Sequence, residues 1–307
     1  MLKENAKIIH VVIASDERYA QHMAVTISSI LANSSANTSF HFHILTNGYK
    51  PETEIKIRGL NKIKESVLDF IMITEDDVKD LPFPPKMSLM INARLKIPSL
   101  LHGLPRAIYL DCDMVVRKSL ETLWDIDLEG NLIGACRDWM ASRKTDRLGV
   151  NKNNYFNSGL LVMDLDKLRE FDFEQKIRQF IKSKKIPLKY LRHDQDVLNC
   201  VLGNMWKHLD LKWNVYAPMI LATVRQRGYN VEELRETLKD PWLIHYTGIK
   251  PSSYLYNDRW PEEYWKYLNK TDFRDFTYTD KSVGNFLLKH SPSVMRKLIK
   301  SILKRMK

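Results

Sequence analysis

The strongest constraint on the fold is an alternation of strand-like and helix-like segments that begins near the N-terminus. Residues 8–14 (IIHVVIA) form a nearly continuous β-branched run, which is typical of a strand buried on both faces of a parallel sheet. A helix is expected over 21–32, followed by a strand at 40–45, a helix at 52–63 and a strand at 66–73. Strands joined by helices in this order build a crossover sheet. The first half of the chain is therefore expected to be Rossmann-like.

The second half of the sequence is expected to continue the same α/β pattern. A helix over 87–101 precedes a short strand at 107–110 that ends directly on an aspartate. Further strands are expected at 132–136 and 160–164, and helices at 166–182, 194–202, 231–238 and 261–268. No repeat of fixed period occurs. One domain over residues 1–280, followed by a distinct tail over 281–307, is the simplest organisation.

Composition favours a globular protein in a reducing compartment. The 307 residues are 44% hydrophobic, which is enough for a substantial core. Three cysteines, Cys112, Cys136 and Cys200, show no CxxC spacing, so neither a disulfide framework nor a thiolate zinc site is indicated. The apolar N-terminal run is too short for a signal segment, and no run approaches the roughly 20 apolar residues of a membrane span. A cytoplasmic location is expected.

Positive charge is concentrated in the tail rather than spread over the chain. Residues 281–307 hold eight of the eleven net positive charges and no acidic residue, which argues against a general nucleic-acid-binding surface. Within this tail, apolar residues recur at helical spacing: Val294, Met295, Leu298, Ile299, Ile302, Leu303 and Met306. A basic amphipathic helix of this kind is suited to an anionic membrane surface. Packing of the apolar stripe on the main domain is the alternative.

The clearest candidate for chemistry is the acidic pair in Asp111-Cys112-Asp113, directly after the strand at 107–110. In open α/β sheets ligands bind at the carboxyl ends of strands. Two hard carboxylates at such an end suit Mg²⁺ or Mn²⁺ bridging a nucleotide diphosphate. Two acids one residue apart also occur in many solvated turns, so the pair alone is a weak signal.

Six motifs occur in a fixed order and strengthen this signal. They are ASDERY (14–19), ARLK (93–96), YLDCD (109–113), YFNSG (155–159), HDQD (193–196) and HYTGIK (245–250). Over residues 7–268 the sequence resembles glycosyltransferase family 8, and within it the bacterial lipopolysaccharide and lipooligosaccharide α-galactosyl- and α-glucosyltransferases. The order of six motifs makes the resemblance far more specific than the acidic pair alone.

The resemblance implies a GT-A type nucleotide-diphospho-sugar transferase fold, a Rossmann-like mixed sheet flanked by helices. It implies a retaining hexosyltransferase that uses Mn²⁺ or Mg²⁺ and moves galactose or glucose from a UDP-hexose. The expected acceptor is a glycan, either free or part of a glycolipid or glycoprotein. With the basic tail, this suggests an enzyme peripheral to the inner face of the cytoplasmic membrane.

The same resemblance assigns roles to individual residues. The metal ligands would be Asp111, Asp113 and His245. The donor-binding residues would also include Ala14, Asp16, Tyr19, Arg94, Cys112, Asn157, Ser158, Gly248 and Lys250. The residues at the reacting sugar would be Asp138, Asp194 and Gln195. Without the motifs, Tyr19 and His245 would be taken for core side chains, and Asp194 for a helix N-cap.

Two questions stay open at the level of sequence. Retention by double displacement needs a carboxylate nucleophile, but the position implied nearest the anomeric carbon is the amide Gln195. A same-face route is favoured, and Asp194 is the alternative nucleophile.

Two other classes also fit an acidic pair at a strand end: a nucleotidyltransferase of similar fold, and a non-catalytic module that binds a sugar nucleotide or glycan. Dehydrogenase, P-loop and zincin motifs do not occur.

Overall fold

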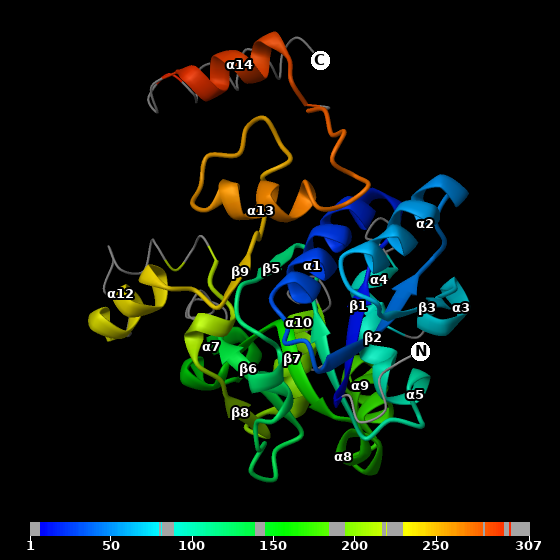
Figure 1. Cartoon of the computed structure of the whole chain (residues 1–307). Helices are drawn as coiled ribbons and strands as arrows, with labels where there is room; N and C mark the ends of the chain where they lie inside the picture. The colour runs from blue at the N-terminus through cyan, green and yellow to red at the C-terminus, as the bar shows by residue number, and fades with distance from the viewer. Residues whose placement is uncertain are drawn as a thin grey trace.

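A computed structural model of the 307-residue chain describes most of the molecule (Figure 1). The described residues are 7–79, 81, 89–138, 145–183, 194–216, 219, 230–278, 280–291 and 295. Residues 87 and 88 of the predicted helix 87–101, His193 of the fifth motif and part of the tail over 281–307 lie outside the described residues.

The core of the described structure is a seven-stranded mixed sheet. Its strand order is β3-β2-β1-β4-β7-β6-β8. The strands are β1 (Lys7–Ala14), β2 (Thr38–Thr46), β3 (Val67–Met72), β4 (Arg106–Leu110), β6 (Ile133–Arg137), β7 (Phe156–Asp164) and β8 (Trp206–His208). β3, β2, β1 and β4 run parallel, whereas β7 is antiparallel to both β4 and β6. The parallel strands form the predicted Rossmann-like half of the sheet, and the remaining strands extend it into a mixed sheet.

Helices cover both faces of this sheet. The helices of the described chain, not all of which contact this sheet, are α1 (Ala20–Ala32), α2 (Pro51–Arg58), α3 (Glu75–Val78), α4 (Met90–Ala93), α5 (Ile97–Leu100), α6 (Glu121–Trp124), α7 (Thr145–Leu148), α8 (Leu165–Glu170), α9 (Phe173–Lys182), α10 (Asp194–Leu202), α12 (Val231–Lys239), α13 (Pro261–Leu268) and α14 (Val283–His290). The apolar side of α1 packs on one face, against Val11 and Phe42. α8, α9 and α10 supply the core on the other face.

Two predicted helices are interrupted, and each interruption has a local cause. The segment expected as one helix over 87–101 contains α4, a 3₁₀ turn (Arg94–Lys96) and α5, where Pro98 lacks an N–H for an α-helical bond. Residues 87 and 88 lie outside the described part. The helix expected over 166–182 divides into α8 and α9 because Asp172 adopts a left-handed conformation (φ 55°).

A small second sheet was not predicted and is important for the site. β5 (Met114–Val116) pairs antiparallel with β9 (Leu243–His245), and Met114 is opposite His245. Each strand has three residues, too few for a recognisable period in sequence. The pairing brings the second half of the chain to the residues that follow β4.

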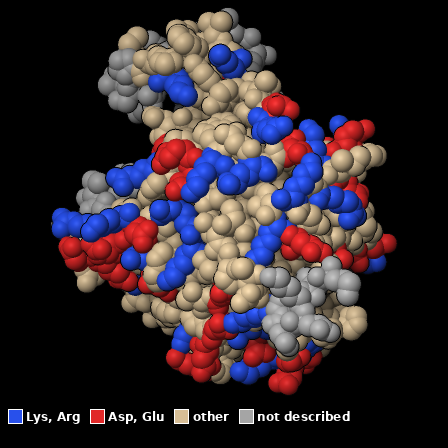
Figure 2. Space-filling model, viewed as in Figure 1, with Lys and Arg blue, Asp and Glu red and all other residues tan. Residues whose placement is uncertain are grey.

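The C-terminal part of the described chain differs from the main body. α14 lies beyond α13 as an outlying element (Figure 1), and Figure 2 shows it as a lobe with Lys and Arg among uncharged atoms. Most of the predicted apolar stripe over 294–306 lies outside the described residues, of which only Met295 belongs to it. Among the helices described here, none has the length and apolar character needed to cross a bilayer.

Candidate active site

The acidic pair occupies the junction between the two sheets. Asp111 follows β4, and its backbone N–H donates to the carbonyl of Gly159 on β7 (2.8 Å). Asp113 precedes β5, and its carbonyl accepts from the N–H of Tyr246, just after β9 (2.9 Å). Backbone bonds to two separate parts of the fold thus fix both aspartates at the carboxyl edge of the main sheet.

His245 completes a three-residue cluster with the two aspartates. Its Nε2 lies 3.2 Å from Oδ1 of Asp113 and 3.6 Å from Oδ2 of Asp111. One ligand atom from each residue lies within 4.8 Å of the other two. Neighbouring ligands of an octahedral cation with bonds of 2.0–2.1 Å are separated by about 2.9 Å. The cluster therefore has donors of the kind and spacing that fit a divalent cation with carboxylate and imidazole ligands.

Asn214 holds His245 from behind and was not predicted from sequence. The Oδ1 atom of Asn214 lies 3.0 Å from Nδ1 of His245, and its Nδ2 donates to Oδ1 of Asn157 (2.8 Å). Because the amide nitrogen is engaged as a donor, the amide oxygen accepts from His245, which turns the lone pair of Nε2 toward the aspartates. Asn214 is fully buried beside β9. The sequence feature that could have indicated this role is an asparagine between apolar residues, in WNVY (213–216).

Glycine fits at position 159, where a residue with a Cβ atom would not. A Cβ atom there would lie 2.6 Å from Cε1 of His245 and 2.8 Å from Oδ2 of Asp111. Both distances are well below contact distance, so any side chain at 159 would displace the cluster. The glycine that ends the fourth motif therefore creates the space in which His245 meets the acidic pair.

Arg94 connects the acidic pair to the first turn of α10. Its guanidinium lies 2.9 Å from Oδ1 of Asp111 and 2.6 Å from Oδ2 of Asp194, and it donates to the carbonyl of Ser158 (2.8 Å). Arg94 and Asp194 are both buried. Burial raises the pKa of Asp194 to about 6, although the positive charge of Arg94 opposes the shift. The Asp194 side chain is thus engaged with Arg94 at the start of α10.

Gln195 has a fixed side-chain orientation. Its Oε1 accepts from the backbone N–H of Ser158 (3.1 Å), and its Nε2 donates to Oδ2 of Asp138 (2.7 Å). Oδ1 of Asp138 in turn accepts from the hydroxyl of Tyr216 (2.8 Å). The sequence placed Asp138 at the reacting sugar; the structure places its carboxylate against Gln195 and Tyr216. Tyr155, from the fourth motif, also lies 3.3 Å from Nε2 of Gln195.

Lys250 contacts the second aspartate of the acidic pair, whereas Arg94 contacts the first. Its ammonium forms an ion pair with Oδ2 of Asp113 and donates to the carbonyl of Tyr246 (2.7 Å). Burial opposes the ionisation of Asp113, but neighbouring positive charge, with the ammonium of Lys250 in direct contact, holds the pKa of its carboxyl well below its usual range. Gly248, between His245 and Lys250, has a positive φ of 80°, a conformation that favours glycine. The sixth motif, HYTGIK (245–250), thus forms a turn at Gly248 that brings Lys250 into contact with Asp113.

Two adjoining cavities meet at the acidic pair. The first has a volume of about 320 Å³ and is lined by the 14–19 segment, Arg94 and residues 111–113, including Cys112. The second has a volume of about 400 Å³ and shares Ile91, Arg94, Asp111 and Asp113 with the first. Its remaining lining is Tyr155, Asn157, Ser158, Asp194, Gln195, Asp196, His245, Thr247, Gly248 and Lys250.

The first loop presents one aromatic face to the smaller cavity. Asp16 accepts from the backbone N–H groups of Arg18 and Tyr19 (3.1 and 3.2 Å) and caps a 3₁₀ turn. Tyr19 is 38% exposed and, like Ala14, lines the cavity. Tyr19 is therefore not a core aromatic side chain, which was the alternative at the level of sequence.

The fold and the acidic site together define a glycosyltransferase of the GT-A type, and comparison with known proteins agrees. The profile of glycosyl transferase family 8 matches residues 10–254. General stress protein A of Bacillus subtilis is 26% identical over 281 residues, which cover 86% of this chain and 94% of that protein. A lipopolysaccharide 1,2-glucosyltransferase of Escherichia coli K12 is 26% identical over 299 residues, covering 93% and 87%.

Among solved structures, the galactosyltransferase LgtC in complex with donor and acceptor sugar analogs has a TM-score of 0.73 and 23% identity. The match covers 94% of this chain and 99% of that one. The chain belongs to glycosyltransferase family 8. This favours the enzyme over the nucleotidyltransferase and the non-catalytic binding module considered from the sequence.

Proposed function

We propose that the protein is a retaining, Mn²⁺-dependent hexosyltransferase that moves galactose or glucose from a UDP-hexose to a saccharide acceptor. The observation that supports this most is the pair of adjoining cavities that share Asp111 and Asp113. A sugar nucleotide has two recognition groups joined by a diphosphate. The smaller cavity, with Tyr19, is suited to the nucleoside, and the larger, polar cavity is suited to the hexose.

Asp111, Asp113 and His245 would hold the cation, with Mg²⁺ as the alternative to Mn²⁺. When bound, the cation would offset the negative charge of the diphosphate and of the leaving UDP. Its ligands are prepared by groups of this chain. Arg94 and the hydroxyl of Tyr109 contact Oδ1 of Asp111 (2.9 and 2.8 Å), so Oδ2 remains directed at His245.

In the smaller cavity we assign the uracil and ribose to Ala14, Asp16 and Tyr19. The exposed ring of Tyr19 offers a face for stacking. The carboxylate of Asp16 pairs with Arg18 (2.8 Å), so a ribose hydroxyl would bind beside this pair. Cys112 lies in the wall of the same cavity.

In the larger cavity we assign the hexose hydroxyls to Arg94, Asn157, Ser158, Asp194 and Gln195. These residues bring guanidinium, amide, hydroxyl and carboxylate groups to one wall, the set that hexose hydroxyls require. We assign Asp138 a positioning role, because its carboxylate holds the Nε2 atom of Gln195.

The side chain of Gln195 is held by hydrogen bonds, and it is an amide rather than the carboxylate that double displacement needs. We therefore favour a same-face displacement. The bond from the anomeric carbon to the β-phosphate oxygen breaks with its electron pair on that oxygen. The acceptor oxygen bonds to the same face of the carbon, and its proton passes to the departing phosphate. Lys250, near Asp113, and the backbone at Gly248 would stabilise the UDP as it leaves. Asp194 is committed to Arg94 at 2.6 Å, which disfavours it as a nucleophile.

We also propose that the C-terminal tail binds an anionic membrane surface and holds the enzyme near a lipid-linked acceptor. On α14, Val283, Phe286 and Leu287 are 79%, 50% and 48% exposed. α14 is joined to the body through the 253–254 segment: Lys289 donates to the carbonyl of Tyr254 (2.7 Å). These three apolar side chains of α14 are thus exposed, whereas Leu288 on the same helix is buried.

One experiment tests the proposed activity. Purified protein is incubated with UDP-galactose, UDP-glucose or a UDP-N-acetylhexosamine, with and without Mn²⁺, and released UDP is measured. We expect Mn²⁺-dependent release from one UDP-hexose, and loss of this release in Asp111→Asn. Release that is equal in the two proteins, or no release from any UDP-sugar while a nucleoside triphosphate stabilises the protein against heat, would contradict the proposal.

A further inference from the structure

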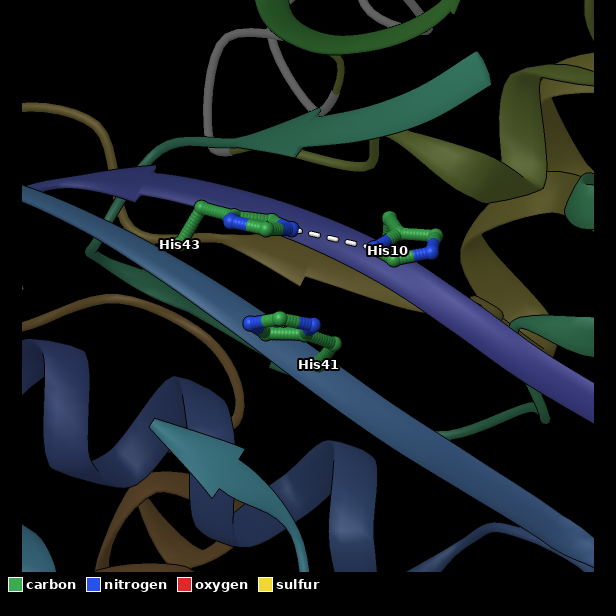
Figure 3. Close-up of side chains that lie close together, drawn as sticks. All are labelled: His10, His41 and His43. Atoms are coloured by element: carbon green, nitrogen blue, oxygen red, sulfur yellow. Dashed lines mark hydrogen bonds between the residues drawn. The ribbon is translucent and has the colours of Figure 1, made fainter. Parts of the chain in front are cut away.

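Three histidines lie together on two neighbouring strands, away from the acidic pair. β1 and β2 are parallel, and their register places His10 opposite His41 and Val12 opposite His43. Because side chains alternate along a strand, all three imidazoles lie on the face of the sheet opposite α1. Figure 3 shows His10 on one strand and His41 and His43 on the next, with the three rings close together.

The ring nitrogens are close enough to share one ligand. Nδ1 of His10 and Nε2 of His43 are 3.0 Å apart. The rings of His41 and His43 stack with centroids 4.2 Å apart, and one ring nitrogen from each of the three histidines lies within 4.8 Å of the others. Four ligands placed tetrahedrally at about 2.0–2.1 Å from a zinc ion are separated by roughly 3.3 Å. The 3.0 Å separation between the nitrogens of His10 and His43 is near this value, and the other nitrogen separations are at most 4.8 Å.

A carboxylate supports the cluster from the third strand. Asp69 of β3 is opposite His43 in the register, and its Oδ2 contacts Nε2 of His41. A carboxylate on one nitrogen of an imidazole orients the ring and makes the other nitrogen a better metal ligand. The side chains of His41 and Asp69 are 25% and 53% exposed, so an ion has a path from solvent.

Burial also affects the protonation of two of these imidazoles, those of His10 and His43. Burial lowers the pKa of His10, and burial together with the neighbouring histidines lowers the pKa of His43 to about 4. Both rings are therefore neutral near pH 7, and a neutral imidazole has the lone pair that a metal requires.

We propose that His10, His41 and His43 bind a transition-metal ion of the Zn²⁺ class, supported by Asp69 and separate from the active site. Three nitrogen ligands suit zinc better than the hard cations expected at the carboxylate-rich Asp111 site. His10 is four residues before Ala14, roughly 13 Å away along β1. The bound ion would cross-link β1 and β2, the strands at the base of the nucleoside loop, and would stabilise the fold without entering the reaction.

The test isolates this cluster from the acidic site. Full-length protein carrying Asp111→Asn and Asp113→Asn is stripped with a chelator and titrated with ZnCl₂, and binding is measured by calorimetry. We expect one equivalent of Zn²⁺ per chain and a rise in Tm on zinc addition. Adding His41→Gln should abolish both effects, whereas adding His102→Gln, at an exposed histidine outside the cluster, should leave them intact.

Cobalt provides a second readout, because Co²⁺ bound by three imidazoles absorbs visible light in a manner that depends on its coordination geometry. If His41→Gln fails to fold, Asp69→Asn takes its place and should weaken zinc binding by about 10- to 100-fold. The proposal is wrong if the Asp111→Asn, Asp113→Asn protein binds no zinc, or if neither His41→Gln nor Asp69→Asn changes its zinc affinity. Loss or retention of transferase activity has no bearing on these outcomes, so they are independent of the proposed function.

Discussion

His245 and Asn214 form a buried pair in which the amide oxygen of Asn214 lies 3.0 Å from Nδ1 of His245. The pair determines which nitrogen of the imidazole carries the proton, since the amide nitrogen of Asn214 already donates to Asn157. Nε2 is therefore left as the acceptor that faces Asp111 and Asp113. A residue that touches neither aspartate thus prepares the third proposed ligand.

Asn214→Ala should weaken Mn²⁺ binding and so raise the Mn²⁺ concentration that the enzyme requires. Without the amide oxygen the imidazole loses its orientation, and loss of such a supporting group typically reduces metal affinity by about 10- to 100-fold. The measurement is a Mn²⁺ titration of UDP release. Asn204→Ala is the matched control, because Asn204 is exposed and, like Asn214, forms a hydrogen bond with another asparagine, accepting from Asn154. Equal Mn²⁺ requirements in the two variants would contradict the role of Asn214.

Gly159→Ala should abolish Mn²⁺-dependent UDP release and lower Tm. The added methyl group would lie 2.6 Å from Cε1 of His245, so the imidazole or the strand must move; overpacking of this kind costs about 1–3 kcal/mol in the free energy of unfolding. Gly103→Ala is the control, since nothing lies within 4 Å of a Cβ at that glycine. Full activity in Gly159→Ala would show that the site tolerates a displaced His245.

The parallel half of the sheet could be predicted from the sequence because each of its strands has a recognisable residue pattern of its own. The run at 8–14 is apolar except for His10, and β1 extends over Lys7–Ala14. β5 and β9 were missed because three residues carry no usable period. Their pairing depends on a contact between residues about 130 positions apart, and such a contact depends on the whole fold rather than on local preference.

The same distinction applies to the site. Asp111 was predictable because it ends a strand, and the order of motifs implied the role of His245. The support from Asn214 and the space left by Gly159 depend on three-dimensional packing that no spacing reveals. The histidines at 10, 41 and 43 illustrate this further: in sequence they lie in two unrelated strands, and only the parallel register brings them together.

Lys250→Ala should lower kcat by roughly 10²- to 10³-fold, the usual effect of removing one group that stabilises developing negative charge. The KM for the UDP-sugar should change less, because Lys250 is already paired with Asp113 before the donor binds. Steady-state kinetics of UDP release at saturating Mn²⁺ measure both values. Lys266→Ala, on the solvent side of α13, serves as the control. A change confined to KM would assign Lys250 to binding alone.

His22 should make the protein less stable in acid. Burial lowers the pKa of His22 to about 4, whereas an unfolded histidine titrates near 6.5. Between these values the unfolded chain binds a proton that the folded chain does not, so the free energy of unfolding decreases as pH falls from 7. By pH 5 this group accounts for about 2 kcal/mol.

The measurement for His22 is urea unfolding at pH 7 and pH 5. His22→Gln should show a smaller loss of stability between the two pH values than the wild-type protein, and His102→Gln, at an exposed position, should behave like the wild type. An unchanged pH dependence in His22→Gln would mean that other groups cause the acid sensitivity.

The double variant Phe286→Ser, Leu287→Ser should bind anionic vesicles at least about 10-fold more weakly than the wild type. Full burial of one such side chain contributes about 1.5–3 kcal/mol, and both are half exposed on α14 and available to a bilayer. Co-sedimentation with vesicles rich in anionic lipid measures the binding. Ile55→Ser is the control, because Ile55 is 69% exposed on α2, in the main body. UDP release in solution should be the same in all three proteins, since α14 contributes no residue to either cavity. If the double variant sediments like the wild type, the apolar side of α14 is not the membrane contact.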